Sequence, residues 1–183
     1  MGRDKVLVPL LAGFEEIEAV TIIDVLRRAE IPVVVASVEA GTVEGSHALS
    51  VLATHALREV DANELAMIAL PGGMPGAKNL AEQPEVQRLV KQVAENGGYT
   101  AAICAAPMAL AAANVHRDHK VTSYPGFDKY LDGANYVQDR VVVDRRVVTS
   151  RGPGTALEFA LTLVRLLRGP EVEADLREKM LVD

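Results

Sequence analysis

The chain has 183 residues, a net charge of -6 and a hydrophobic fraction of 49 %. This length fits one domain with one core, which buries about two-thirds of the surface of the unfolded chain. No apolar run approaches the roughly 18 residues that a membrane-spanning helix requires. An acidic chain without basic runs interleaved with aromatic residues binds nucleic acid poorly. We therefore expect a single domain over residues 1–183 that binds neither nucleic acid nor a membrane.

The first residues and the cysteine content indicate a cellular compartment. Residues 1–5 run directly into a strand-like segment, without the apolar region and cleavage site of a signal peptide. Cys104 is the only cysteine, so no internal disulfide can form. Both features are typical of the cytoplasm, where reducing conditions leave a thiol free for chemistry or redox sensing.

Strands and helices are predicted to alternate along the chain. The expected strands are 5–10, 31–38, 67–70, 99–103, 120–124, and short segments at 137–139, 140–144 and 146–150. Residues 42–54 are expected to form a short edge hairpin or an added antiparallel strand. The expected helices are 14–28, a short turn from Asp61, a helix that starts at Pro84 and ends before Gly97, 105–115, 155–167 and 171–181. Such alternation predicts an α/β fold whose parallel sheet is covered by helices on both faces.

Cys104 falls at the corner between the strand 99–103 and the helix 105–115. The first backbone N–H groups of a helix are unpaired and carry partial positive charge, which favours a thiolate over a thiol. The thiolate is the reactive form of cysteine. The alternative is a buried cysteine that acts only as a small apolar side chain.

Glu18 lies on the same helical face as Ile22, Val25 and Ala29, so a carboxyl group heads an apolar stripe. If this side chain is buried, desolvation raises its pKa and can leave it protonated, able to donate a hydrogen bond. The alternative is an ordinary first-turn acid whose side chain turns back to water.

A glycine-rich turn over residues 71–77 follows the strand 67–70 and contains Gly72 and Gly73. Open α/β sheets bind ligands at the carboxyl ends of their strands. Glycines there permit positive φ and let backbone N–H groups approach an anion or a developing oxyanion. The turn matches no nucleotide-binding motif, and an ordinary tight turn is the alternative. A second such turn leads into Thr155 and Glu158, spaced as a capping box.

The histidines are predicted to lie on the surface and to bind no metal. His47 and His55 flank the expected hairpin, without nearby acids or cysteines in the sequence. His116 and His119 are spaced to approach one ion, but only Asp118 offers a third ligand. We therefore expect neither a metal nor a cofactor.

Four sequence motifs carry a family resemblance. They are Gly13-Phe14-Glu15-Glu16-Ile17-Glu18, Leu70-Pro71-Gly72-Gly73, Ala101-Ala102-Ile103-Cys104-Ala105-Ala106-Pro107 and Thr149-Ser150-Arg151-Gly152-Pro153-Gly154-Thr155. Together they resemble the ThiJ/PfpI superfamily, and within it the Parkinson-associated (DJ-one) branch and its bacterial YajL-type relatives. The resemblance runs from Lys5 to about Leu181.

The resemblance implies a flavodoxin-like three-layer sandwich, a homodimer, and a cysteine on a nucleophile elbow. It implies that Cys104 is the nucleophile, that Glu18 hydrogen-bonds the sulfur, and that the backbone of Gly73 and Ala105 forms the oxyanion site. Further residues expected near this pocket are Gly72, Tyr124 and Glu15.

Two positions depart from the patterns of this superfamily. Protease-like and chaperone-like branches usually carry histidine directly after the cysteine, where this chain has Ala105. The Parkinson-associated branch often carries a histidine where this chain has Tyr124. A phenol with a pKa near 10 is a poor general base at neutral pH. Catalysis by this chain is therefore expected to be slow, and neither a protease nor an amidotransferase is expected.

The resemblance implies a cysteine-dependent stress-response protein that acts on small reactive carbonyls. The expected substrates are 2-oxoaldehydes such as methylglyoxal, or their early glycated adducts, in a glyoxalase or deglycase reaction. The alternative is a redox sensor or redox-regulated chaperone in which Cys104 is oxidised to the sulfinate. A purely structural or amidotransferase-like role fits less well, because no histidine occupies an evident partner position.

Overall fold

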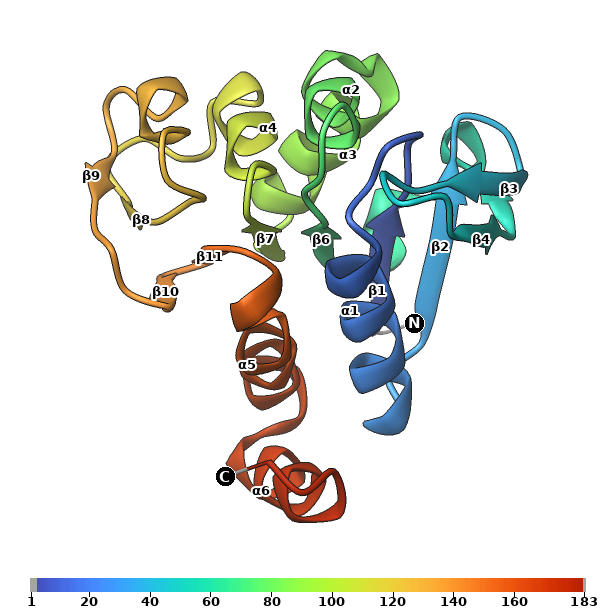
Figure 1. Ribbon diagram of the computed structural model, residues 1–183, viewed down its shortest axis with the longest axis vertical. Coiled ribbons are helices and arrows are strands. Elements are labelled where there is room, and N and C mark those ends of the chain that lie inside the picture. The colour runs from blue at the N-terminus through green and yellow to red at the C-terminus, as the bar shows by residue number, and fades with distance from the viewer. Residues whose placement is uncertain (1–2, 183) are drawn as a thin grey trace.

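A seven-stranded sheet forms the middle layer of the computed structural model, which describes residues 3–182 (Figure 1). Its strand order is β10-β11-β7-β6-β1-β2-β5. The strands are β1 Lys5–Pro9, β2 Val33–Ser37, β5 His55–Ala56, β6 Leu65–Leu70, β7 Tyr99–Ile103, β10 Val141–Asp144 and β11 Val147–Ser150. All neighbouring strands pair in parallel except β10 and β11, which form an antiparallel hairpin.

Helices cover both faces of this sheet, as Figure 1 shows. One face carries α1 Glu16–Arg28, α5 Ala156–Arg168 and α6 Pro170–Lys179. The other face carries α2 Gly76–Glu82, α3 Pro84–Glu95 and α4 Pro107–Ala112. The predicted three-layer α/β sandwich is therefore confirmed. No helix among residues 3–182 combines the length and apolarity that a bilayer crossing requires.

The central strands are apolar throughout because both of their faces are buried. In β1, Val6 and Val8 pack against α1 and α5, whereas Leu7 points to the opposite core under α2 and α3. β6 alternates in the same way, with Met67 on one side and Ile68 on the other. The continuous apolar runs in the sequence were thus a sound basis for predicting a parallel sheet.

Two small sheets lie outside the central one. β3 Gly41–Glu44 and β4 Ser50–Ala53 form the hairpin that the sequence predicted. β8 Lys120–Val121 pairs only with β9 Asn135–Tyr136, so the predicted strand over residues 120–124 is too long and does not join the central sheet. After Val121 the backbone no longer forms strand hydrogen bonds. The Thr122 N–H donates instead to the Thr149 side chain. Residues 137–139 are not a strand either.

Several helix boundaries differ from their predictions. α2 was not predicted, because the helix-breaking glycines and prolines before it concealed its start. The helix expected over 105–115 is shorter, and a left-handed residue, Asn114, follows its end. Thr155 does not cap α5 as the spacing suggested; its hydroxyl donates instead to the Gly152 carbonyl at 2.9 Å. The predicted short turn after Asp61 is present as the 3-10 segment η2, Ala62–Glu64, and Asp61 caps it.

Candidate active site

Cys104 occupies the sharp corner between β7 and α4, as predicted. Its φ is +64°, a left-handed conformation that costs a non-glycine residue about 1–3 kcal/mol. Backbone hydrogen bonds hold the corner: the Cys104 N–H donates to the Ser150 carbonyl at 3.0 Å, and the Tyr124 N–H donates to the Cys104 carbonyl at 2.8 Å. The sulfur is thereby fixed at the carboxyl ends of the central strands.

The Glu18 side chain is fully buried, which confirms one of the two alternatives for this residue and excludes the water-facing one. The Gly72 N–H donates to its Oε2 atom at 2.7 Å. A Cβ at position 72 would lie 2.7 Å from the Cys104 Cβ and 2.8 Å from Glu18 Oε2. Only glycine fits at this point, and its absence of a side chain lets the carboxyl and the thiol meet.

Burial raises the pKa of Glu18 to about 7, although the hydrogen bonds from Gly72 and from the Cys104 thiol oppose this shift. Burial, followed by the charge of Glu18 and its hydrogen bond to the thiol, raises the pKa of Cys104 to about 12. The backbone N–H groups of Gly73 and Ala105 lower this pKa, but by less. The backbone N–H groups thus favour the thiolate, as predicted, but burial and Glu18 outweigh them and raise the pKa of the thiol.

The two groups titrate as a pair, because two negative charges in one buried site repel each other. A thiolate forms most readily when Glu18 holds the proton. The carboxyl then donates a hydrogen bond and adds no charge of its own. Glu18 Oε1 is available for this bond, since no other hydrogen-bond partner for it lies within residues 3–182.

The backbone donors expected for an oxyanion site lie beside the sulfur. The backbone N–H groups of Gly73 and Ala105 approach the Cys104 sulfur and lower its pKa. Gly73 has a φ of +87°, and a Cβ there would overlap the backbone of Glu15. Glycine is therefore required to turn this N–H group toward the sulfur.

Tyr124 lies next to Cys104 in space, although it does not end a strand of the central sheet. Its side chain is 46 % exposed. A Cβ on Gly152 would come within 3.3 Å of the ring, so the phenol packs directly over that glycine. Phe127 meets the same ring edge-on, with 6.3 Å between the centroids. Gly72 and the Tyr124 backbone thus lie beside Cys104, whereas the Glu15 side chain faces Ser46 and His47.

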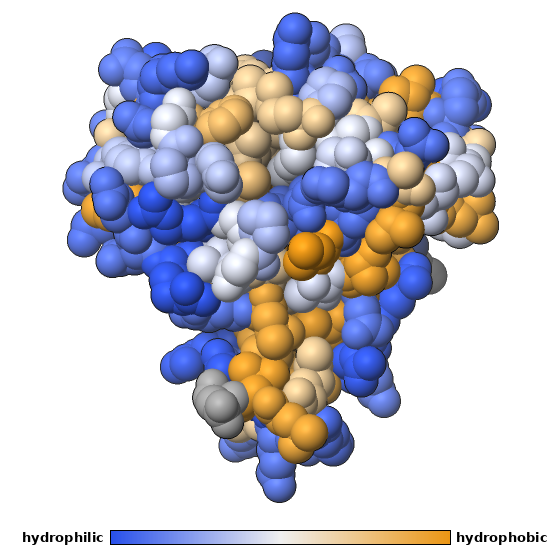
Figure 2. Space-filling view, in the orientation of Figure 1, coloured by the Kyte–Doolittle hydropathy of each residue, from blue (hydrophilic) through white to orange (hydrophobic). Residues whose placement is uncertain are grey.

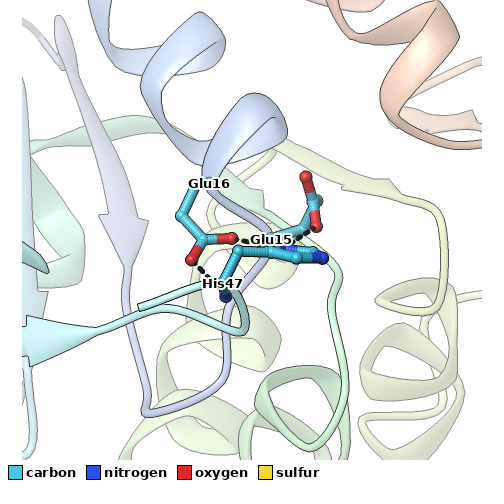
Figure 3. Close-up of side chains that lie close together, drawn as sticks. All are labelled: Glu15, Glu16 and His47. Atoms are coloured by element: carbon cyan, nitrogen blue, oxygen red, sulfur yellow. Dashed lines mark hydrogen bonds and ion pairs between the residues drawn. The ribbon is translucent and has the colours of Figure 1, made fainter. Parts of the chain in front are cut away.

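Glu15 and Glu16 both contact His47, which sequence reasoning missed (Figure 3). Glu15 caps α1 by accepting a hydrogen bond from the Ile17 N–H. Burial raises the pKa of Glu16, but hydrogen bonds from His47 and Leu49 outweigh it and lower the pKa to about 2. The hydrogen bond to Glu16 raises the pKa of His47. The expectation that His47 lacks acidic neighbours is wrong, because the β3–β4 loop lies against the start of α1.

The other three histidines differ in how far they are buried. His55 is exposed, as expected. His116 is only 3 % exposed and its Nε2 lies 2.9 Å from the Asp132 carbonyl, so the prediction of a surface residue is wrong there. His119 is half-buried against Asp144. Within residues 3–182, neither His116 nor His119 joins a group of three metal-binding side chains.

Comparisons with known proteins agree with this fold and identify relatives of the chain. The chain is 41 % identical over 170 residues to Protein DJ-1 homolog A of Arabidopsis thaliana, covering 91 % of this chain and 43 % of that protein, so it spans less than half of that relative. It is 39 % identical over 158 residues to the glutathione-independent glyoxalase DJR-1.2 of Caenorhabditis elegans, covering 86 % and 84 %. The crystal structure of DJ-1beta from Drosophila melanogaster matches with a TM-score of 0.95 at 38 % identity, covering 100 % of both chains. The DJ-1/PfpI family model matches residues 4–166, and the chain belongs to this family.

Proposed function

We propose that this protein converts 2-oxoaldehydes such as methylglyoxal, or their early adducts on amino and thiol groups, through Cys104. The observation that carries the proposal is the contact between a thiol on a strained corner and a buried carboxyl group whose pKa is raised to about 7. A general acid or base works best when its pKa lies near the working pH. The similarity to a relative named as a glyoxalase supports the same chemistry.

In the first step, the Cys104 thiol transfers its proton to Glu18 and the thiolate attacks the aldehyde carbon. The new carbon–sulfur bond forms as the carbonyl π bond breaks, which leaves an alkoxide. We assign the stabilisation of that negative charge to the N–H groups of Gly73 and Ala105, which approach the sulfur. Glu18 then returns the proton and yields a hemithioacetal.

The second step moves a proton between adjacent carbons of the bound substrate. The Glu18 carboxylate removes the proton from the hemithioacetal carbon, and the resulting enediol is reprotonated on the neighbouring carbon. This isomerisation oxidises one carbon and reduces the other, so no external oxidant is needed. Water hydrolyses the thioester that results, releasing lactate from methylglyoxal and restoring the thiol.

The site lacks an imidazole to accelerate these proton transfers. Ala105 follows the cysteine directly, and Tyr124 offers only a phenol. Glu18 must therefore serve both as acid and as base. We expect turnover to be slow.

Lactate formation from methylglyoxal tests this proposal. Wild type, Cys104→Ala and Glu18→Leu are purified in parallel, with His55→Ala as a matched surface control. Wild type and His55→Ala are expected to make many lactate molecules per chain, whereas Cys104→Ala and Glu18→Leu make none above the uncatalysed rate. Equal rates in wild type and Cys104→Ala, after contaminating enzymes are removed, would overturn the proposal.

Oxidation of Cys104 to the sulfinate is the second candidate function. Two equivalents of peroxide each transfer one oxygen to the sulfur and leave as water. The absence of a second cysteine prevents an internal disulfide, and the unpaired Glu18 Oε1 could hydrogen-bond a sulfinate oxygen. After mild peroxide, the intact mass is expected to rise by two oxygens at Cys104. Glu18→Gln should retain this product and Glu18→Leu should lose it; oxidation of methionines alone would contradict the idea.

We also propose that the chain forms a homodimer in the cytoplasm. Ile17 and Val20 on α1 are 58 % and 49 % exposed. Figure 2 shows apolar side chains gathered on the same side of the molecule, over α1 and α5. Contiguous exposed apolar surface of this kind is typical of a protein–protein interface.

A further inference from the structure

A second cluster of chemically capable side chains lies where the β3–β4 loop meets the start of α1 (Figure 3). Glu15, Glu16 and His47 each offer one ligand atom, and these atoms lie within 4.8 Å of one another. Glu15 is 7 % exposed and Glu16 is 4 % exposed, whereas the His47 side chain is 72 % exposed. Buried carboxylates are costly unless a positive charge or a metal ion compensates them.

The distances in this cluster suit a small tetrahedral metal ion. His47 Nδ1 lies 2.9 Å from Glu16 Oε2 and 3.4 Å from Glu15 Oε2. The Ser46 hydroxyl oxygen lies 3.0 Å from Nδ1, 3.2 Å from Glu16 Oε2 and 3.4 Å from Glu15 Oε2. Tetrahedral zinc with bonds of about 2.0–2.1 Å holds its ligand atoms about 3.3 Å apart. Five of the six separations among these four atoms are therefore already close to those of such a site.

The side chains of this cluster have fewer hydrogen-bond donor protons than they have close contacts between polar atoms. Ionised carboxylates only accept hydrogen bonds, and the Ser46 hydroxyl and the His47 Nδ1 supply at most one proton each. These two protons cannot satisfy every approach between the oxygens and the nitrogen at 2.9–3.4 Å. A cation at the centre would face a lone pair of each atom and remove this deficit.

The surrounding backbone holds Glu16 in the orientation that a ligand needs. Its Oε1 atom accepts hydrogen bonds from the backbone N–H groups of His47 at 2.5 Å and Leu49 at 3.4 Å, which leaves Oε2 facing the imidazole. A Cβ on Gly45 would overlap this carboxyl group, so glycine makes room for it. Such support from neighbouring groups fixes metal ligands in other proteins.

We propose that Glu15, Glu16 and His47 bind a divalent transition-metal ion such as Zn²⁺, with water or the Ser46 hydroxyl in the fourth position. One imidazole nitrogen with two carboxylate oxygens favours zinc over calcium or magnesium, which take oxygen ligands almost exclusively. The bound ion ties the β3–β4 loop to the first turn of α1. This site uses neither Cys104 nor Glu18, although the charge of Glu15 acts on Glu18.

Zinc binding to the full chain tests this assignment. Titration calorimetry with Zn²⁺ is performed on Cys104→Ala, since a thiol could bind zinc on its own. One ion per chain is expected, and Co²⁺ should give the visible absorption of a tetrahedral site without sulfur-to-metal charge transfer. Failure of lactate formation would not affect this result, because the Cys104→Ala chain is already inactive in the proposed reaction.

Histidine variants in the same background provide the matched comparison. His47→Ala is expected to weaken zinc binding at least tenfold. His55→Ala should leave it unchanged, because His55 is also exposed and pairs with a neighbouring hydroxyl, Thr54 Oγ1, at 2.9 Å. Glu15→Gln should weaken binding as well, with folding confirmed by circular dichroism. If His47→Ala and His55→Ala bind zinc with equal affinity, or if the chain binds no zinc, the cluster is only an ion pair and the proposal is wrong.

Discussion

Replacement of Gly72 by alanine tests whether the contact between Glu18 and Cys104 governs the thiol. The added Cβ would lie 2.7 Å from the Cys104 Cβ, 2.8 Å from Glu18 Oε2 and 3.0 Å from the Ile103 carbonyl oxygen. Carbon atoms pack best at about 3.5–4.0 Å, so the neighbours must move apart by about 0.8 Å or more. Only the Glu18 carboxyl can move by side-chain rotation, because the Cys104 Cβ is fixed by its backbone and the third neighbour is itself backbone.

Overpacking of this kind costs about 1–3 kcal/mol, which is roughly a 5- to 150-fold change in the folding equilibrium constant. Gly154→Ala is the matched control, because a Cβ there meets no atom within 4 Å. We expect that variant to stay within about 0.5 kcal/mol of wild type. Urea unfolding measures the stability of both variants, and alkylation of Cys104 against pH measures the thiol.

Gly72→Ala is expected to lower stability and to shift the alkylation profile, because it separates the carboxyl from the sulfur. Gly154→Ala should change neither. An unchanged alkylation profile in a destabilised Gly72→Ala would show that contact with Glu18 does not control the thiol. An unchanged stability would show that the overlap is relieved without cost.

Three further changes probe the same site and the surface beside it. The pKa of Glu18 is about 7 in the folded chain, above its ordinary value of 4.5. Between these pH values the folded state binds more protons than the unfolded state, so the protein loses about 3 kcal/mol of stability as pH rises from 4.5 to 7. Urea unfolding across this range should show the decline in wild type and a flatter profile in Glu18→Gln; equal slopes would refute the assignment. Tyr124→His supplies a base with a pKa near 6.5, so lactate formation should rise about tenfold or more, while Tyr124→Phe should not increase it. Ile17→Lys places a charge on the exposed apolar face of α1 and should shift sedimentation from dimer to monomer; a monomeric wild type would contradict the proposed dimer.

Local patterns in the sequence were sufficient to predict the centre of the site. The apolar run before Cys104 and the alanines after it predicted the strand-to-helix corner. Helical spacing placed Glu18 in line with Ile22 and Val25, which are buried with it. These features depend on neighbours within a few residues. Helical spacing put Glu18 on the apolar face of its helix, but it left open whether the carboxyl group is buried.

Features that depend on distant contacts could not be predicted in the same way. His47 meets Glu16 across 31 positions of sequence, because the hairpin between β3 and β4 folds over the start of α1. His116 is buried because the segment around Asp132 covers it, and no periodicity in its own polar segment indicates this. The raised pKa of Cys104 could not be predicted from the sequence either. Burial and the charge of Glu18 raise it by more than the helix start lowers it.

The first turn of α1 contributes a carboxyl group to each of the two proposed sites. Successive residues of a helix are rotated by about 100°, so Glu16 and Glu18 leave the axis about 200° apart. Glu18 therefore faces Gly72 and the thiol, whereas Glu16 faces the β3–β4 loop and His47. Because the helix separates the two carboxyl groups, a cation bound on the Glu16 side need not contact the thiol. Loss of zinc binding with intact thiol reactivity in His47→Ala is the result that this geometry requires.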